Sequence, residues 1–189
     1  MKRIVCALAA LLSLSVATAD DSRPAPLRLA DGFATPLQVD AALLASLTRT
    51  HVEASDHGKP ARWDGVALTE LLSKAGAPAG KQLRGAGLSL CLRFSAADGY
   101  RTVLALAEFD PEFGNAGALL ADTRDGKPLD ANEGPYRLIL PREQRAGRWI
   151  RQLERVDLLD CADAPAAKPA AADAAGHDHP AKATTDAGH

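Results

Sequence analysis

Short apolar runs separated by polar turns dominate the chain, and this pattern predicts many strands and few helices. Residues 88–94 and 101–106 are apolar runs on either side of the polar stretch 95–100, so they are expected to form two strands joined by a turn. Residues 27–39 predict one or two short strands around the turn at Asp31 and Gly32. Further extended segments are expected at 48–53, 137–140 and 149–159.

Helical spacing is confined to two short segments. Asp40 is suited to cap a helix that presents Leu43, Leu44 and Leu47 on one face. Residues 68–75 carry leucines at helical spacing, and Gly76 is a stop signal after them. Residues 119–121 are too few to assign from their pattern alone. Together, the predicted strands and helices indicate a strand-rich α+β domain with short helices.

The first 19 residues have the pattern of a secretory signal peptide. Lys2 and Arg3 precede the apolar run 4–12, and small residues at 17–19 suit cleavage. That run is shorter than the roughly 20 residues needed to span a membrane. A periplasmic or secreted protein without stable membrane insertion is therefore expected, with its mature chain beginning near Asp20.

The last 28 residues, 162–189, contain no leucine, isoleucine, valine or aromatic residue, and a disordered tail is expected there. Residues 20–161 then form one domain of ordinary size. The chain has 22 basic and 24 acidic residues and a net charge of −2. Because it has no basic stripe interleaved with aromatic residues, nucleic-acid binding is not expected.

Two cysteines remain after signal removal, Cys91 in an apolar run and Cys161 at the end of the last extended segment. An oxidising compartment favours a disulfide between them. The alternative is that each is a separate small buried side chain.

A series of short motifs follows in order along the domain. They are Trp63-Asp64-Gly65-Val66-Ala67-Leu68, Asp98-Gly99-Tyr100, Leu119-Leu120-Ala121, Asp125-Gly126-Lys127-Pro128-Leu129, Gly134-Pro135-Tyr136-Arg137-Leu138 and Arg148-Trp149-Ile150. The ordered set resembles the molybdopterin-binding domain of the sulfite oxidase family, over residues 37–158. The resemblance implies that family's fold, with mixed, barrel-like sheets and a cleft for a pterin cofactor.

The resemblance also shows where the chain departs from the family. The family pattern Cys-Val-Glu-Ala, whose cysteine binds molybdenum, corresponds here to His51-Val52-Glu53-Ala54. Molybdenum in this family is held by sulfur, so the domain offers neither a metal ligand nor a catalytic residue that we can name. Residues 142–147 are also poorer in Gly, Ser and Lys than the family pattern. A pterin is therefore expected in preference to complete molybdopterin.

A pterin requires an aromatic or apolar wall and a few fixed polar groups, and a phosphate would add a need for Arg or Lys. The candidate contacts are His51, Trp63, Tyr100, Arg137, Arg148 and Trp149. The structural alternative is that the aromatic residues are core anchors and that the loop arginines are solvated.

Three functions follow from these observations. The favoured hypothesis is a periplasmic pterin-binding or pterin-sensing protein without catalysis, which by resemblance reports to the periplasmic domain of a membrane signalling protein. The alternative is a molybdopterin-dependent oxidoreductase or a redox accessory subunit. The third is a metal-binding accessory protein that uses the tail histidines His177, His179 and His189.

Overall fold

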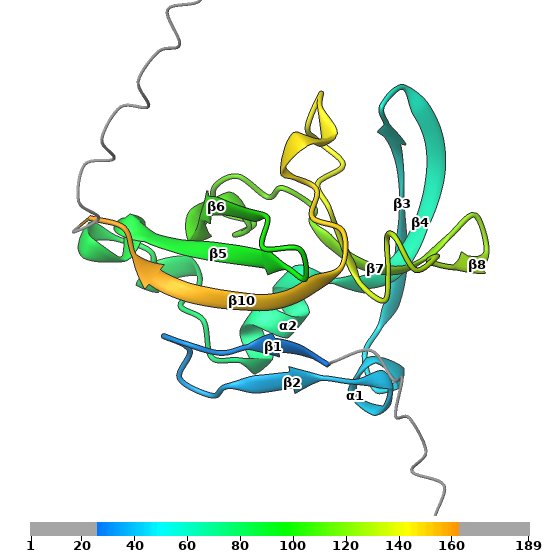
Figure 1. The fold of residues 1–189 in the computed structure, drawn as a ribbon. Helices are drawn as coiled ribbons and strands as arrows, with labels where there is room; N and C mark the ends of the chain where they lie inside the picture. Colours follow the sequence, from blue (N-terminus) through cyan, green and yellow to red (C-terminus); the bar gives the residue numbers. More distant parts are fainter. Residues whose placement is uncertain (1–25, 163–189) are drawn as a thin grey trace, which may run out of the picture.

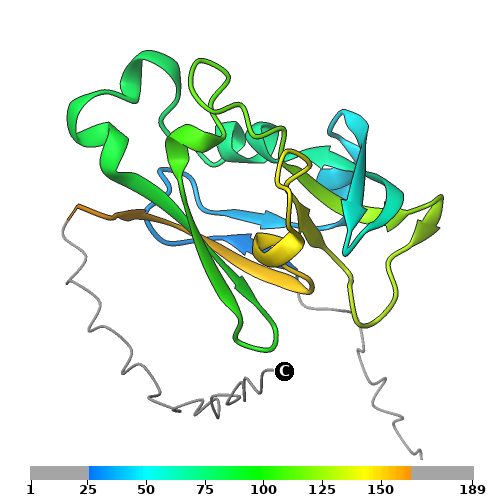
Figure 2. The ribbon, with the colours of Figure 1, turned by 90° about the horizontal axis from the view of Figure 1, so that it is seen from above.

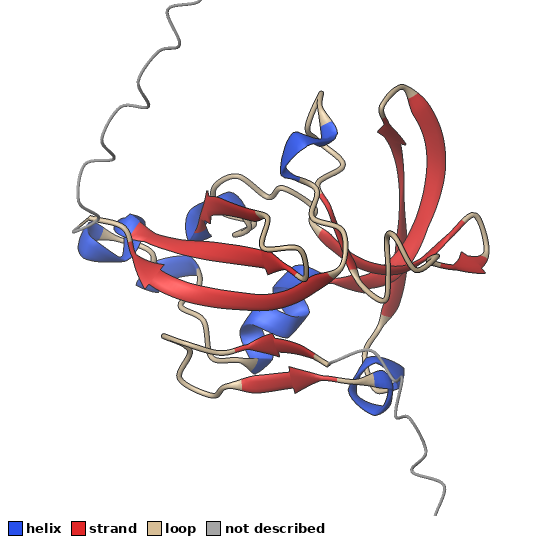
Figure 3. Ribbon diagram, in the orientation of Figure 1, coloured by secondary structure: helices blue, strands red, loops and turns tan. Residues whose placement is uncertain are grey.

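The computed structural model describes residues 26–162 (Figure 1). The expected signal peptide, the tail after residue 162 and the tail histidines lie outside these described residues. Strands dominate the described part and the helices are short, as Figure 3 shows. This agrees with the strand-rich α+β fold that the sequence predicted.

One sheet has five strands in the order β2-β1-β10-β5-β6. Their bounds are Leu37–Val39 for β2, Leu27–Leu29 for β1, Leu153–Asp160 for β10, Leu90–Ala96 for β5 and Arg101–Ala105 for β6. Strands β1 and β10 pair in parallel, and the other pairs are antiparallel, so the sheet is mixed.

The other sheet has the order β3-β4-β7-β8, and β9 also pairs with β7. Their bounds are Arg49–Asp56 for β3, Lys59–Ala67 for β4, Leu119–Arg124 for β7, Lys127–Pro128 for β8 and Arg137–Ile139 for β9. Strands β3 and β4 form a long hairpin that rises away from the rest of the molecule (Figure 1).

The two α-helices of the described residues form where the local sequence predicted them, whereas the four 3₁₀ helices there were not predicted. Helix α1 covers Ala41–Ala45, and the Asp40 carboxylate accepts a hydrogen bond from the Leu43 amide at 2.8 Å. Helix α2 covers Leu68–Lys74, and Gly76 follows with a φ of +74°. The 3₁₀ helices are η1 (Gly80–Gln82), η2 (Gly85–Ser89), η3 (Leu106–Glu108) and η4 (Ala146–Arg148).

Strand β4 is the main element that the sequence pattern missed. Ala61 and Trp63 are buried while Arg62 is exposed, which is the alternation of a strand. Gly65 is the next buried position of that alternation, and it is glycine for a packing reason, because a Cβ there would lie 2.0 Å from the carbonyl oxygen of Leu120 in β7. The glycine of the Trp-x-Gly motif thus permits the close approach of two strands.

A single apolar core joins the two sheets and helix α2. Its largest fully buried side chains include Trp63, Phe94 and Phe109. The indole rings of Trp63 and Trp149 meet edge to face with centroids 6.0 Å apart. Among residues 26–162, no helix has the length and apolar character needed to cross a membrane.

Cys91 in β5 and Cys161, just after β10, form a disulfide with Cα atoms 6.0 Å apart. This is the bridge that the sequence favoured. It links the end of β10 to the strand that pairs with it, across a sequence separation of 70 residues.

We expect Cys161→Ser to lower the free energy of unfolding by about 2–4 kcal/mol, because the unfolded chain regains the freedom that the bridge removes. Urea unfolding with and without a reductant measures this. The reductant should destabilise the native sequence and leave the variant unchanged. Equal stability of the oxidised native protein and the variant would contradict the prediction.

Candidate functional site

A cleft opens where three segments meet: the tip of the β3–β4 hairpin, the β5–β6 turn and the η4 segment. Its volume is about 290 Å³, near the lower end of the range of small-molecule sites, which is roughly 300–1,000 Å³. Seen from above, the η4 segment (yellow) lies between the β5–β6 hairpin (green) and the β3–β4 hairpin (cyan) (Figure 2). The lining residues are Asp56, His57, Ala96, Asp98, Tyr100, Arg137, Ala146, Gly147, Trp149 and Arg151.

Arg137 of β9 is the buried cation of this cleft, with only 4% of its side chain exposed. One guanidinium nitrogen, Nη2, lies 3.0 Å from Asp56 Oδ2, and Nη1 lies 2.7 Å from Glu133 Oε1. The guanidinium carbon lies 4.9 Å from the ring centre of Trp63 and 5.8 Å from that of Trp149. The two carboxylates compensate the buried charge, and the indoles add cation–π attraction.

Arg124 extends this group of charges. Its Nη1 lies 3.1 Å from Glu133 Oε1, and its guanidinium carbon lies 4.8 Å from the Trp63 ring centre. We call Arg124, Arg137, Asp56 and Glu133 the charge cluster. Two of its buried atoms, Asp56 Oδ1 and Arg137 Nε, have no hydrogen-bond partner among the described residues. Such an unpaired buried group is a feature that needs an explanation.

Aromatic side chains form a wall of the cleft. Trp149 is 5% exposed, and its indole N–H donates to the Leu140 carbonyl oxygen at 3.1 Å. Tyr100 is 51% exposed, and its hydroxyl donates to the Gly147 carbonyl oxygen at 2.7 Å. That bond fastens the β5–β6 turn to the η4 segment and leaves part of the Tyr100 ring accessible for stacking.

The rim of the cleft carries polar residues from two turns. Asp98 accepts a hydrogen bond from the Tyr100 amide at 2.9 Å, which shapes the β5–β6 turn. His57 and Gly58 have φ values of +49° and +79°, as expected for a tight hairpin turn. The His57 side chain is 85% exposed, and its Nε2 lies 3.7 Å from Asp56 Oδ1, beyond hydrogen-bonding distance.

The structure brings Tyr100, Arg137 and Trp149 together on the cleft. Trp63 lies behind them, fully buried, and its indole N–H donates to the Ala54 carbonyl oxygen at 3.3 Å. Trp63 therefore packs against the guanidinium of Arg137 and does not line the cleft.

His51 lies in a different, open hollow, which it shares with Arg49, Arg62 and Asp64. His51 pairs with Asp64 in the β3–β4 register. Since side chains alternate along a strand, His51 and Asp56, five positions apart, project to opposite faces of the hairpin. His51 is thus separated from the charge cluster by the sheet.

Arg148 lies in a third hollow, with Glu108 and Glu143. Its guanidinium forms ion pairs with both, with Nη2 at 3.5 Å from Glu108 Oε2. The adjacent residues Arg148 and Trp149 therefore point to different hollows.

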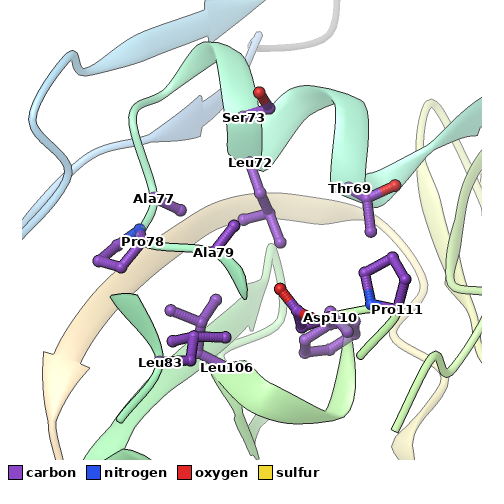
Figure 4. Close-up of a pocket in the computed structure, with 11 residues that line it drawn as sticks. Thr69, Leu72, Ser73, Ala77, Pro78, Ala79, Leu83, Leu106, Asp110 and Pro111 are labelled. Atoms are coloured by element: carbon purple, nitrogen blue, oxygen red, sulfur yellow. The ribbon is translucent and has the colours of Figure 1, made fainter. Parts of the chain in front are cut away.

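An apolar pocket beside α2 is a further hollow. Leu72, Leu83 and Leu106 turn toward one another there, and Asp110 lies at its edge (Figure 4). Its volume is only about 70 Å³, well below the roughly 300–1,000 Å³ of small-molecule sites. The Asp110 oxygens already accept hydrogen bonds from the amides of Gly80 and Glu112. This pocket is too small for a bicyclic ligand.

Sequence reasoning missed the acidic members of the charge cluster. It assigned Asp56 only to a polar turn, and it gave Glu133 no role. Glu133 lies four positions before Arg137, but Asp56 lies 77 positions before Glu133, and only the pairing of β9 with β7, of β7 with β4 and of β4 with β3 brings Asp56 to Arg137. No local pattern marks such a pair.

We expect Arg137→Met to lower the free energy of unfolding by about 3–5 kcal/mol, because Asp56 and Glu133 lose their buried counter-charge. Arg148→Met is the matched control, since Arg148 is 44% exposed and should cost less than about 1 kcal/mol. Urea unfolding of both variants measures the difference. A loss for Arg137→Met that is no larger than the loss for Arg148→Met would contradict the prediction.

Arg49, which lines the hollow around His51, forms an ion pair with Asp122 that should make stability depend on pH. Burial raises the pKa of Asp122, but the hydrogen bonds from Arg49 and Thr123 outweigh it and hold that pKa below its ordinary value. The Arg49–Asp122 pair should therefore stabilise the fold above about pH 4, and this contribution should be lost as the pH falls through the lowered pKa.

The test compares the native protein with Asp122→Asn. We expect the difference in free energy of unfolding to be larger at pH 6 than at pH 3, and Arg49→Gln should show the same trend. A difference that grows toward acid would contradict the prediction.

Comparison with known proteins identifies the family of this chain. The family model described as the oxidoreductase molybdopterin binding domain matches residues 42–165. A search of curated proteins found no match. Among solved structures, the crystal structure of the sulfane dehydrogenase SoxCD from Paracoccus pantotrophus is similar, with a TM-score of 0.57 and 17% sequence identity.

The similarity to that structure concerns the fold. It covers 72% of this chain and 38% of the other, so this chain spans well under half of its relative's length. The family model, by contrast, covers more than half of this chain and includes every residue that lines the cleft. Its description indicates a pterin-type ligand as a class. The chain belongs to the oxidoreductase molybdopterin-binding domain family.

Proposed function

We propose that this chain is a periplasmic pterin-binding protein whose cleft holds a pterin without molybdenum. The observation that carries the proposal is the cleft itself, which combines the accessible Tyr100 ring and the Trp149 wall with the buried charge cluster. A flat bicyclic ring with donors and acceptors along its edge suits an aromatic wall next to fixed polar groups.

The residues of this chain do not fit a molybdenum centre of the family type, which needs a protein thiolate. Cys91 and Cys161 are the cysteines of the described residues, and both are consumed in the disulfide. His51, which by resemblance corresponds to the family cysteine, lies on the face of the hairpin opposite the cluster. Within residues 26–162, His, Cys, Asp and Glu form no group of three that could hold a metal ion. We therefore derive no reaction step through molybdenum.

The periplasmic part of the proposal has two supports. The N-terminal 19 residues carry the signal-peptide pattern, and a disulfide persists in oxidising compartments. A binding protein without catalysis acts by presenting its bound state to a partner. By resemblance, that partner is the periplasmic domain of a membrane signalling protein.

A molybdopterin-dependent oxidoreductase, or a redox accessory subunit, is the second candidate. The family match favours it, and the similar solved structure is named a sulfane dehydrogenase. A metal-binding role for His177, His179 and His189 is the third hypothesis, and it rests on the sequence alone.

Protein purified from its native periplasm distinguishes these candidates. Mass spectrometry and fluorescence identify a bound pterin, and elemental analysis of the same sample measures molybdenum. A pterin without molybdenum supports the proposal, whereas one molybdenum per chain would replace it with the oxidoreductase. Metal uptake that disappears when residues after Asp163 are deleted would support the tail hypothesis.

We expect Tyr100→Ala to weaken pterin binding about tenfold or more, since stacking of a flat base on an aromatic ring is worth roughly 1–3 kcal/mol. The fold should be little affected because the side chain is half exposed. His51→Ala is the control, and it should leave affinity unchanged because it lies in the other hollow. Fluorescence titration measures both. If His51→Ala weakened binding and Tyr100→Ala did not, the ligand would occupy the hollow around His51.

A further inference from the structure

We infer that the cleft selects an unphosphorylated pterin, and that Asp56 recognises the ring by accepting a hydrogen bond from the edge that carries the amino group. This inference rests on the proposed function and specifies its ligand. It follows from the charges around the cleft and from one carboxylate oxygen that has no hydrogen-bond donor.

The ionised side chains at the cleft balance one another. The positive side chains that line it are Arg137 and Arg151, and the negative ones are Asp56 and Asp98. Arg124 and Glu133, which are joined to Arg137 by ion pairs, add one charge of each sign. His57 at the rim is solvent-exposed. A site for a phosphate dianion normally carries an excess of positive charge, and this cleft has none.

Both terminal nitrogens of the buried cation are already committed, and only its Nε lacks a partner among the described residues. Arg137 holds Asp56 through one nitrogen and Glu133 through another, at 3.0 and 2.7 Å. A phosphate that bound Arg137 would displace one of these carboxylates or lie beside it. Either arrangement places like charges together in a buried site, which disfavours the phosphorylated ligand.

Arg151 is the remaining cation of the cleft. It is exposed, and it forms no ion pair with any residue of the described chain. A single solvated arginine contributes little to binding an anion. Asp98, on the same cleft, further reduces its effect on a phosphate.

Two buried atoms of the charge cluster are unpaired among the described residues, the donor Arg137 Nε and the acceptor Asp56 Oδ1. Asp56 Oδ2 binds Arg137, but Asp56 Oδ1 is buried without a donor. His57 lies beside this oxygen at 3.7 Å and is 85% exposed, so its side chain can turn away without losing packing. A ligand N–H that took the place of the His57 side chain would donate the hydrogen bond that Asp56 Oδ1 lacks.

A pterin carries such donors together, as the 2-amino group and the neighbouring ring N–H. Lumazine is the analogue in which an oxo group replaces the amino group, so it presents an acceptor there. A buried carboxylate oxygen accepts a hydrogen bond from the first and repels the second. Asp56 therefore distinguishes ligands by their amino edge.

The experiment is a binding titration of the signal-processed protein with two ligand pairs: neopterin and neopterin 3′-phosphate, and pterin and lumazine. We expect neopterin to bind at least about tenfold more tightly than its phosphate ester, and pterin at least about tenfold more tightly than lumazine. In Asp56→Asn the ratio of pterin to lumazine affinity should fall toward one. Asp64→Asn, on the opposite face of the same hairpin, is the matched control and should keep the native ratio.

Tighter binding of the phosphate ester, or equal binding of pterin and lumazine by the native protein, would overturn this inference and leave pterin binding intact. Absence of binding by all four compounds would overturn the proposed function and this inference together. If Asp56→Asn does not fold, the four affinities of the native protein still decide the question.

Discussion

The ion pairs of Arg137 are the interaction on which the site depends. A guanidinium with almost no solvent contact is tolerated only when carboxylates compensate its charge. Here one carboxylate, Glu133, lies four positions before Arg137, and the other, Asp56, comes from a distant part of the chain. Asp56 is the last residue of β3, and Glu133 precedes β9 by a few residues. Their attraction to one side chain places the tip of a long hairpin over β9, and the cleft exists because of that placement.

Trp63 shows how the same residues serve packing and site geometry at once. It is buried and contacts Trp149 edge to face, and its ring lies under the guanidinium groups of Arg124 and Arg137. Gly65, two positions later, is required by the approach of β4 to β7. The Trp-x-Gly motif is therefore a structural motif in this chain. Its resemblance to the family identifies the scaffold and does not by itself identify ligand contacts.

The sequence predicted what depends on local chemistry. The capping of α1 by Asp40, the stop of α2 at Gly76 and the pairing of β5 with β6 around a polar turn are all present. Strand β4 was missed because Pro60, Gly65 and alternating charges obscure its apolar face. The resemblance brought Tyr100, Arg137 and Trp149 to attention, and they share the cleft. It also selected His51 and Arg148, whose side chains lie in other hollows, because motif order does not specify which face of a strand or turn a residue occupies.

The cleft is lined from both sheets: Asp56 and Arg137 belong to strands of one, and Ala96 to a strand of the other, with Tyr100 in the adjoining turn. A ligand held there touches two layers that otherwise meet through the core, so part of its binding energy resists their separation. Saturation at 100 times the dissociation constant would add about 2.7 kcal/mol to the stability of the native state. The ligand-bound protein would then be degraded more slowly by proteases than the free protein. The abundance of the protein would therefore rise with the ligand concentration in its compartment.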